Sequence, residues 1–408
     1  MGIVRTSFKE NRTGMTDTAL NPKPAQRLLS LDVLRGITIA FMIMVNNNGG
    51  RGSWHFMNHA EWNGLTPTDL VFPTFVFVVG ASIVFAFHAR MKRGATRKQL
   101  AWHTVWRAVI LFALGMVVNG FPFFALDHLR FYGVLQRIAV CYLVVGLFYI
   151  WDQRVSTKVL ALVASLVGYW VLLRWVPVPG AGMPGRDFPF MDVRMNLVSW
   201  LDRLIMPHHL YLEWGGADPH NLRDPEGLLS NLPAFGTALL GLLTGLWLRG
   251  QRAAKETAMG LGMGAVTCLA LGYLWSLEFP LNKNMWTSSF VLVAAGWSLT
   301  VLTLSYLVMD VWGWGRGESK WLVYPWLVLG SNAITAYMFS EIVPGILDHI
   351  AIPDGYGTHS SPMWWMATHV FVHMPTPGLA AFAYSCFTLA YCFVPVWIMY
   401  RNKIFVKV

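Results

Sequence analysis

Charged side chains are scarce in this chain, since Asp, Glu, Lys and Arg together make up only 13% of its residues while 55% are hydrophobic. A soluble domain carries about 25% charged residues, so this composition, with a mean hydropathy of +0.46, excludes a soluble protein of this length. The alternation of polar and apolar residues that marks a barrel strand is also absent. The sequence therefore predicts an all-α polytopic membrane protein.

Motifs of several well-known chemistries are missing as well. The chain has no GxxxxGKS/T phosphate loop, no HExxH zinc helix and no paired CxxC, so neither ATP-driven nor zinc chemistry is predicted and no metal site is expected. All four cysteines fall within long apolar runs, which argues against an external disulfide framework. Residues 1–27 lack the apolar segment of a cleavable signal peptide, and we predict a disordered cytoplasmic tail there.

Long apolar runs dominate the remainder of the chain. A bilayer core about 30 Å thick requires about 20 apolar residues per helix. Ten segments meet this requirement, namely residues 28–46, 69–89, 100–120, 133–151, 157–176, 230–249, 256–277, 286–308, 321–342 and 377–400. We therefore predict about ten transmembrane helices in one domain, residues 28–401, followed by a short cytoplasmic tail, residues 402–408.

Lys and Arg are divided unevenly between the two sides of this predicted bundle. The side that holds both termini carries 20 of them, and the opposite side carries eight although its loops are longer. Because basic loops stay in the cytoplasm, both termini are predicted to be cytoplasmic. This bias explains the excess of 31 basic over 21 acidic residues, so the expected partner is the lipid bilayer and not a nucleic acid.

Two long loops lie on the external side of this topology, residues 177–229 and 343–376. Loops of such length are usually functional or disordered. Within the first loop, residues 191–206 place apolar side chains at helical spacing. This pattern predicts a helix that lies at the membrane interface.

Ionisable residues inside the spans are costly and suggest function. Asp32 and Arg35 lie three residues apart near the cytoplasmic end of the first span, so they share a helical face and can pair. Their pair is either structural, or it directs the Arg35 guanidinium toward an anionic ligand that arrives from the cytoplasm. Arg107 lies near the middle of the third span.

Charged and polar residues also mark the outer ends of two spans. Asp69 begins the second span, and Gln136 and Arg137 lie near the outer end of the fourth. We predict that Asp69 and Arg137 form an ion pair beneath the external loop that carries His59.

This external loop, between the first two spans, holds the strongest candidates for chemistry. His59 is a candidate general base, because the unperturbed pKa of a histidine is close to neutral pH and polar residues such as Asn63 lie near it in the sequence. Asn46, Asn47 and Asn48 offer amide donors that suit an oxyanion hole. Residue chemistry alone leaves His59 as one of twelve histidines, and a polar helix end explains the asparagines equally well.

Six motifs, spread in order along the chain, together resemble one known family. They are RLLSLDVLRGITIAFMIMVNN, HAEWNGLTPTDLVFPTFVFVVGASI, YGVLQRIAV, DPEGLLSNLPA, PLNKNMWTSSFVL and LGSNAITAY. The chain resembles heparan-alpha-glucosaminide N-acetyltransferases and their bacterial NagX-type relatives. The resemblance implies that His59 is the active histidine, and that Asn46, with Asn47 or Asn48 as alternates, is the catalytic asparagine.

The resemblance further implies the reaction and its substrates. An acetyl group would pass from cytoplasmic acetyl-CoA to the amine of a glucosamine-type sugar or glycan outside a bacterial inner membrane. Arg35, Asp32 and Arg107 are then expected to bind CoA. Four more residues are expected to support the site or bind the acceptor, namely Asn63, Asp69, Gln136 and Arg137. A homodimer is compatible with the resemblance.

Three alternatives remain open from the sequence. The chain can be an amino-sugar permease in which His59 relays protons, or an O-acyltransferase of a glycan. If it is an N-acetyltransferase, transfer can be direct or can pass through an acetyl-His59 intermediate.

Overall fold

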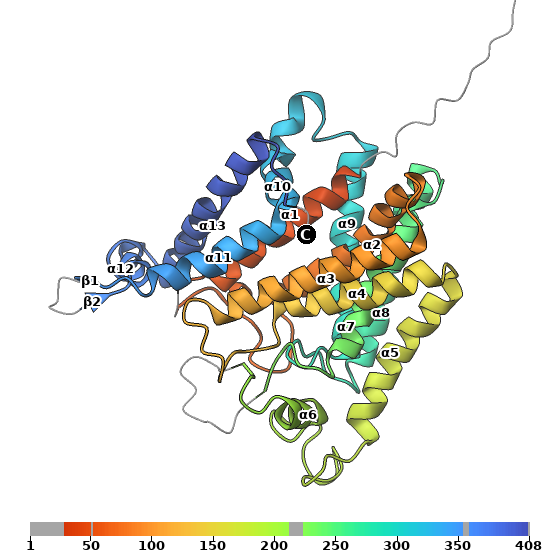
Figure 1. Ribbon diagram of the computed structural model, residues 1–408, viewed down its shortest axis with the longest axis horizontal. Helices are drawn as coiled ribbons and strands as arrows, with labels where there is room; N and C mark the ends of the chain where they lie inside the picture. The colour runs from red at the N-terminus through yellow and green to blue at the C-terminus, as the bar shows by residue number, and fades with distance from the viewer. Residues whose placement is uncertain (1–27, 50–51, 212–222, 354–358, 407–408) are drawn as a thin grey trace, which may run out of the picture.

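The computed structural model describes residues 28–49, 52–211, 223–353 and 359–406, almost entirely as helices (Figure 1). The helices are α1 (Leu29–Asn46), α2 (Val71–Lys92), α3 (Arg97–Gly120), α4 (Val134–Trp151), α5 (Val155–Trp175), α6 (Leu197–Ile205), α7 (Asn231–Arg249), α8 (Ala254–Trp275), α9 (Ser288–Ser305), α10 (Lys320–Ser331), α11 (Ala333–Leu347), α12 (Pro362–His369) and α13 (Pro377–Arg401). The expected all-α fold is confirmed.

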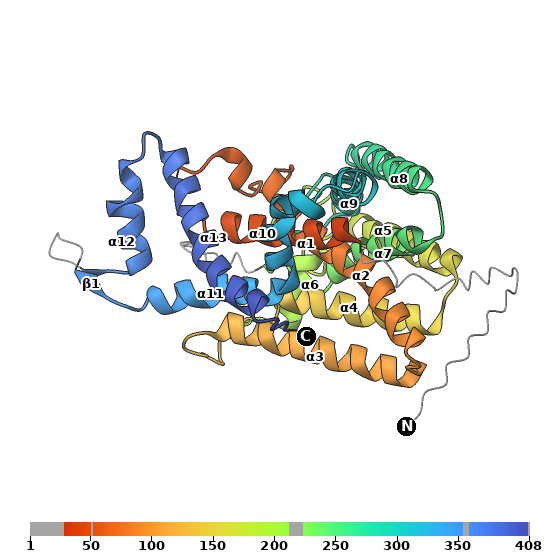
Figure 2. The same ribbon diagram turned by 90° about the horizontal axis from the view of Figure 1, so that it is seen from above.

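Shorter elements connect these helices. Four are 3₁₀ turns, at His55–Met57, Pro67–Leu70, Gly317–Ser319 and Phe371–His373, and a π-helical turn, Tyr306–Val311, extends α9. Strands β1 (Ile352–Pro353) and β2 (His359–Ser360) pair antiparallel, with Ile352 opposite Ser360. With α12 they form a projection at one end of the molecule, whereas α8 and α9 pack together at the other (Figure 2).

Nine helices in the described part of the chain are long and apolar enough to cross a membrane. They correspond to nine of the ten predicted spans. The tenth, residues 321–342, was expected to be one continuous helix, and this expectation is wrong. The chain is bent there by 72° between the Gly317–Ser331 and Ala333–Leu347 segments.

Asn332 lies at this break and its side chain bonds to a distant segment. Its Nδ2 donates to the carbonyl of Ile404 (3.1 Å), and its Oδ1 accepts from the amide of Val406 (2.9 Å). Asn side chains that bond elsewhere compete with the regular helix, and the backbone at Asn332 has φ −130° and ψ 43°. Residues 404 and 406 therefore pack back against the bundle in what was predicted to be a tail.

Close contact between α2 and α7 fixes the position of the second span. A Cβ atom at Gly80 would lie 2.0 Å from the carbonyl oxygen of Ala238, and one at Gly241 would lie 1.9 Å from that of Phe77. Glycine at both positions lets the two backbones approach, as small residues do in membrane bundles. The middle parts of α2 and α7 are thereby held together.

The helix predicted within residues 191–206 is present as α6. Val198 and Asp202 are buried, while Leu204 and Ile205 are exposed. Its position at the membrane interface remains a prediction. The predicted disordered tail, residues 1–27, lies outside the described residues.

Candidate active site

His59 and Asp69 form a hydrogen-bonded pair at the start of the second span. Nδ1 of His59 lies 2.7 Å from Oδ1 of Asp69, whose side chain is only 1% exposed. The other carboxylate oxygen accepts from the amides of Ala60 (3.1 Å) and Thr66 (2.9 Å) and from the Thr66 hydroxyl (3.1 Å). A carboxylate surrounded by these donors accepts the Nδ1 proton of His59, so that Nε2 keeps its lone pair for chemistry.

The local sequence explains why Asp69 occupies this position. Thr66 and Asp69 are the first and fourth residues of a capping box that starts the 3₁₀ turn Pro67–Leu70 before α2. The side chain of Asp69 must therefore turn back toward the residue that precedes the helix, where the loop brings His59.

Lys283 approaches the same histidine from the loop between α8 and α9. Its Nζ lies 3.1 Å from Nδ1 and 3.0 Å from Nε2 of His59. Two contacts join the loops, because Gly64 donates its amide to Leu281 (2.8 Å) and Asn282 donates its side chain to Oδ1 of Asn63 (3.1 Å). Asn63, predicted to support the site, thus lies at the junction of the two loops.

The electrostatic environment favours a neutral His59. Burial and the charge of Lys283 lower the pKa of His59 below its usual 6.5, although the hydrogen bond to Asp69 opposes this shift. Burial also lowers the pKa of Lys283, against the carboxylates of Glu226 and Asp69. The His59 side chain is still 45% exposed. A histidine that is neutral near pH 7 and accessible can act as a general base.

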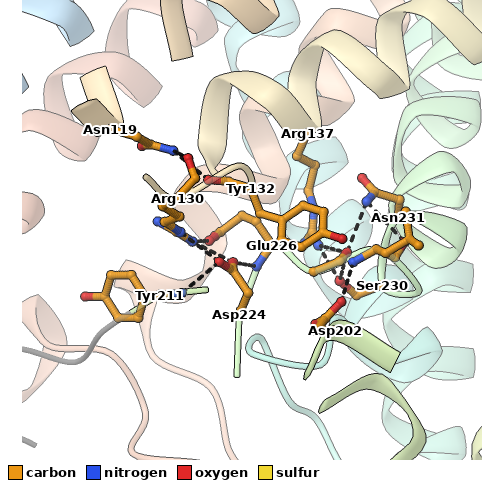
Figure 3. Close-up of polar contacts among 12 residues, drawn as sticks. Asn119, Arg130, Tyr132, Arg137, Asp202, Tyr211, Asp224, Glu226, Ser230 and Asn231 are labelled. Carbon is orange, nitrogen blue, oxygen red and sulfur yellow. Dashed lines mark hydrogen bonds and ion pairs between the residues drawn. The ribbon is translucent and has the colours of Figure 1, made fainter. Parts of the chain in front are cut away.

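A buried ionic cluster forms around Arg130 (Figure 3), and its Glu226 lies close enough to His59 to favour the charged imidazolium. Arg130 donates to both carboxylate oxygens of Asp224 (2.8 and 2.6 Å) and to Oε2 of Glu226 (2.5 Å). Burial disfavours the charged guanidinium, but the two carboxylates raise the pKa of Arg130 overall. Asn119 fixes the backbone, since its side chain donates to the carbonyls of Arg130 (2.9 Å) and Tyr132 (2.7 Å).

Arg137 does not pair with Asp69, so that prediction is wrong. Its Nη2 donates to the carbonyl of Gly227 (3.3 Å) and to the hydroxyl of Ser230, and its guanidinium lies 4.7 Å from the ring centroid of Trp286. Arg137 thus supports the segment after Glu226, while Asp69 bonds to the histidine closer in sequence.

Gln136, the neighbour of Arg137, lies between helices. Its Nε2 is 3.7 Å from the sulfur of Met116, and its carboxamide lies where a Cβ at Gly115 would be. The contacts described for Gln136 lie in the packing between α3 and α4.

The three candidate asparagines have different surroundings. Asn46 donates to Glu341 in α11 (3.3 Å), and Asn47 donates to the carbonyl of Ile43 (3.1 Å). Asn48 donates to Oδ1 of Asn58 (3.1 Å), the residue immediately before His59.

A cavity of about 600 Å³ lies between α1, α2, α3, α4, α10, α11 and α13, and its wall extends along α2 from Phe75 to Arg90. Its walls include Arg35, Arg90, His103 and Arg107, from α1, α2 and α3. Arg35 contacts Asp32 (3.3 Å) and Ser82 (2.8 Å), and Arg107 contacts Tyr142 (3.3 Å). A small cavity of about 10 Å³ lies next to it and shares the lining residues Phe75, Leu135, Ile138, Ala333 and Ile334. The structure therefore brings Arg35 and Arg107 together around one space, with Asp32 behind Arg35.

Comparison with known proteins identifies the family. The family model described as heparan-alpha-glucosaminide N-acetyltransferase, catalytic, matches residues 27–277. The chain belongs to this family. It is 31% identical to human heparan-alpha-glucosaminide N-acetyltransferase over 360 residues, covering 78% of this chain and 53% of that protein. It is 29% identical to the mouse protein over 364 residues, covering 78% and 54% respectively.

The chain thus spans about half the length of these curated relatives. The region matched by the heparan-alpha-glucosaminide N-acetyltransferase model contains His59, Asp69, Arg130 and Glu226, and it stops shortly before Lys283.

Sequence reasoning missed Lys283, Glu226, Arg130 and Asp224 as members of the site. Three of them were within motifs that carried the family resemblance, since Asp224 and Glu226 belong to DPEGLLSNLPA and Lys283 to PLNKNMWTSSFVL. Charged residues in the loops between spans were the available signal. What the sequence could not provide was the meeting of these loops, because Lys283 lies 224 residues from His59.

Proposed function

We propose that this chain is a transmembrane N-acetyltransferase that moves an acetyl group from cytoplasmic acetyl-CoA to the amine of a glucosamine-type sugar on the external side. The observation that carries this proposal is the pair of Asp69 and His59, joined at 2.7 Å through Nδ1. It leaves Nε2 of an accessible histidine as a base. The names of the human and mouse relatives state the same reaction class.

The cavity of about 600 Å³ suits the donor. CoA carries several phosphates, and the guanidinium groups of Arg35, Arg90 and Arg107 offer strong hydrogen bonds to them. Asp32 orients the guanidinium of Arg35 through their ion pair. The apolar walls that continue toward Tyr337 suit the pantetheine arm. On the predicted topology this cavity faces the cytoplasm, and the termini lie on the same side.

The acceptor is proposed to reach His59 from the external loops. Glu226 and Glu341 supply carboxylates on the same side of the bundle, which can accept from sugar hydroxyls or an ammonium group.

The chemistry follows from the position of Nε2. His59 removes a proton from the acceptor ammonium, and the free amine attacks the thioester carbonyl. Asp69 stabilises the resulting imidazolium through Nδ1. An amide side chain stabilises the oxyanion, which the family resemblance assigns to Asn46 and the contact with Asn58 favours assigning to Asn48. The C–S bond breaks as the amide forms, the CoA thiolate takes the proton from His59, and the second proton of the former ammonium is released to solvent.

The test is acetyl transfer by protein purified in detergent, with labelled acetyl-CoA and glucosamine. We expect labelled N-acetylglucosamine, and loss of transfer in His59→Ala. An ester product, cleaved by hydroxylamine, would instead support O-acyl transfer. Glucosamine uptake into proteoliposomes without any acetyl transfer would overturn the enzyme proposal in favour of a permease.

A further inference from the structure

The side-chain amine of Lys283 lies where an acceptor amine must react. Its Nζ is 3.0 Å from Nε2 and 3.1 Å from Nδ1 of His59, beside the ring whose Nε2 is proposed to remove the acceptor proton. The acceptor and Lys283 are both primary amines that are cationic in water. Lys283 therefore lies within reach of the same base that the acceptor amine requires.

Rigid contacts hold Lys283 in this position. The neighbouring Asn282 is 0% exposed, donates to Asn63 (3.1 Å) and accepts from the amide of Met285 (2.8 Å). Trp286, also fully buried, adopts a φ of 53°, which turns the chain sharply after the lysine. The fold of the loop therefore places the backbone of Lys283 next to His59.

Burial, and not the neighbouring carboxylates, makes the Lys283 ammonium easier to deprotonate. The carboxylates of Glu226 and Asp69 favour the ammonium form, whereas the nearby cation of Arg137 disfavours it. Burial is the largest influence and lowers the pKa of Lys283 below its usual value. Desolvated lysines with lowered pKa values are the ones that act as nucleophiles in proteins.

We propose that Lys283 competes with the acceptor for the acetyl group, so that in the absence of acceptor the protein acetylates its own Lys283. This inference rests on the proposed function, because it requires the thioester of acetyl-CoA to reach His59.

The reaction balances without another reactant. The Lys283 ammonium gives a proton to Nε2 of His59, and the neutral amine attacks the thioester carbonyl carbon. The new C–N bond forms as the C–S bond breaks, and the CoA thiolate takes the proton from His59. The products are Nε-acetyl-Lys283, the CoA thiol and one proton released from the lysine.

Acetylation of Lys283 is expected to block the site. An amide is a poor acyl donor, so the acetyl group cannot pass on to a sugar. The acetylated side chain is uncharged, so it loses its electrostatic attraction to Glu226. It also fills the space beside His59. Acceptor sugar should therefore protect the enzyme, and exposure to donor alone should inactivate it over time.

The experiment compares wild-type protein and variants in detergent, each incubated with isotope-labelled acetyl-CoA alone and then analysed by peptide mass spectrometry. We expect label on Lys283 in the wild type, resistant to hydroxylamine as an amide is, and its suppression by saturating glucosamine. His59→Ala and Asp69→Asn should each reduce the labelling rate by about 100-fold, in line with loss of a general base. Exposed Lys98 reports unassisted acetylation and should not change.

Lys283→Arg completes the test, since arginine keeps the charge and cannot be acetylated in this way. This variant should show no time-dependent loss of activity when it is held with acetyl-CoA. Label on Lys283 that equals that on Lys98, or that is unchanged in both His59→Ala and Asp69→Asn, would overturn the inference. Glucosamine turnover without any label on Lys283 would overturn it alone, whereas the absence of both acetylations would also overturn the proposed function.

Discussion

Arg130 holds Asp224 through two parallel hydrogen bonds, 2.8 Å and 2.6 Å long, between segments 94 residues apart in sequence. The carboxylate of Asp224 is 0% exposed, and the same guanidinium also contacts Glu226. The two hydrogen bonds between Arg130 and Asp224 join the segment before α4 to the segment before α7. They therefore determine where Glu226 lies relative to His59 and Lys283.

Removing this arginine should be strongly destabilising. Arg130→Ala leaves two buried carboxylates without their cation, and breaking a buried pair in this way costs about 3–5 kcal/mol. We expect a clear fall in the thermal unfolding temperature in detergent. Arg186→Ala is the matched control, because the ion pair of Arg186 with Asp187 is exposed and solvent screens such pairs, so its loss should have little effect on stability. Equal effects of both substitutions would contradict the role assigned to Arg130.

Asp69→Asn tests the pairing of Asp69 with His59 while preserving the size of the side chain. An amide can donate to Nδ1 and thereby favour the wrong tautomer of the imidazole. We expect kcat to fall by about 10²–10⁴-fold, with little change in KM for acetyl-CoA, because the donor cavity is elsewhere. The measurement is steady-state acetyl transfer, with Asp127→Asn as an exposed control. A large rise in KM with unchanged kcat would be inconsistent with a positioning role at His59.

The pH dependence of the reaction should reveal Lys283. The pKa of His59 is lowered below 6.5, so kcat at saturating acceptor should rise through a value below 6.5 as the imidazole loses its proton. Lys283→Met removes a neighbouring positive charge that lowers this pKa. The acidic limb of the profile should then move to higher pH, whereas Lys283→Arg should leave it near its original position. A limb that does not move in Lys283→Met would show that the ammonium does not act on His59.

Much of the fold could be predicted from the sequence, because span length and apolar composition report directly on membrane crossing. Nine of the ten predicted spans correspond to single helices in the described part of the chain. The break in the tenth could not be predicted, since the partners of Asn332 are the backbone atoms of Ile404 and Val406, more than 70 residues away. Periodicity contains no information about such a contact.

Prediction of the site was limited for the same physical reason. Charge and depth placed Asp69 and Arg137 at one level of the membrane, but depth does not determine which neighbour each side chain faces. The capping geometry at Thr66 turns Asp69 toward His59. The chemistry of the histidine side chain could not distinguish His59 from the other histidines. The family resemblance could, because it matched the motif that contains His59. Lys283 required the three-dimensional meeting of two loops.

The last prediction concerns the amide that stabilises the oxyanion. Asn48 bonds to Asn58, the residue before His59, whereas Asn46 bonds to Glu341 in α11. We expect Asn48→Ala to lower kcat by about 10²–10³-fold, which is the usual cost of losing one oxyanion donor, and Asn46→Ala to affect mainly KM for the sugar through Glu341. Both variants are compared by steady-state transfer, after their unfolding temperatures have been shown to match the wild type. The opposite order of kcat losses would assign the oxyanion to Asn46, as the family resemblance implies, and would mean that the loop of Asn48 serves only to hold His59 in place.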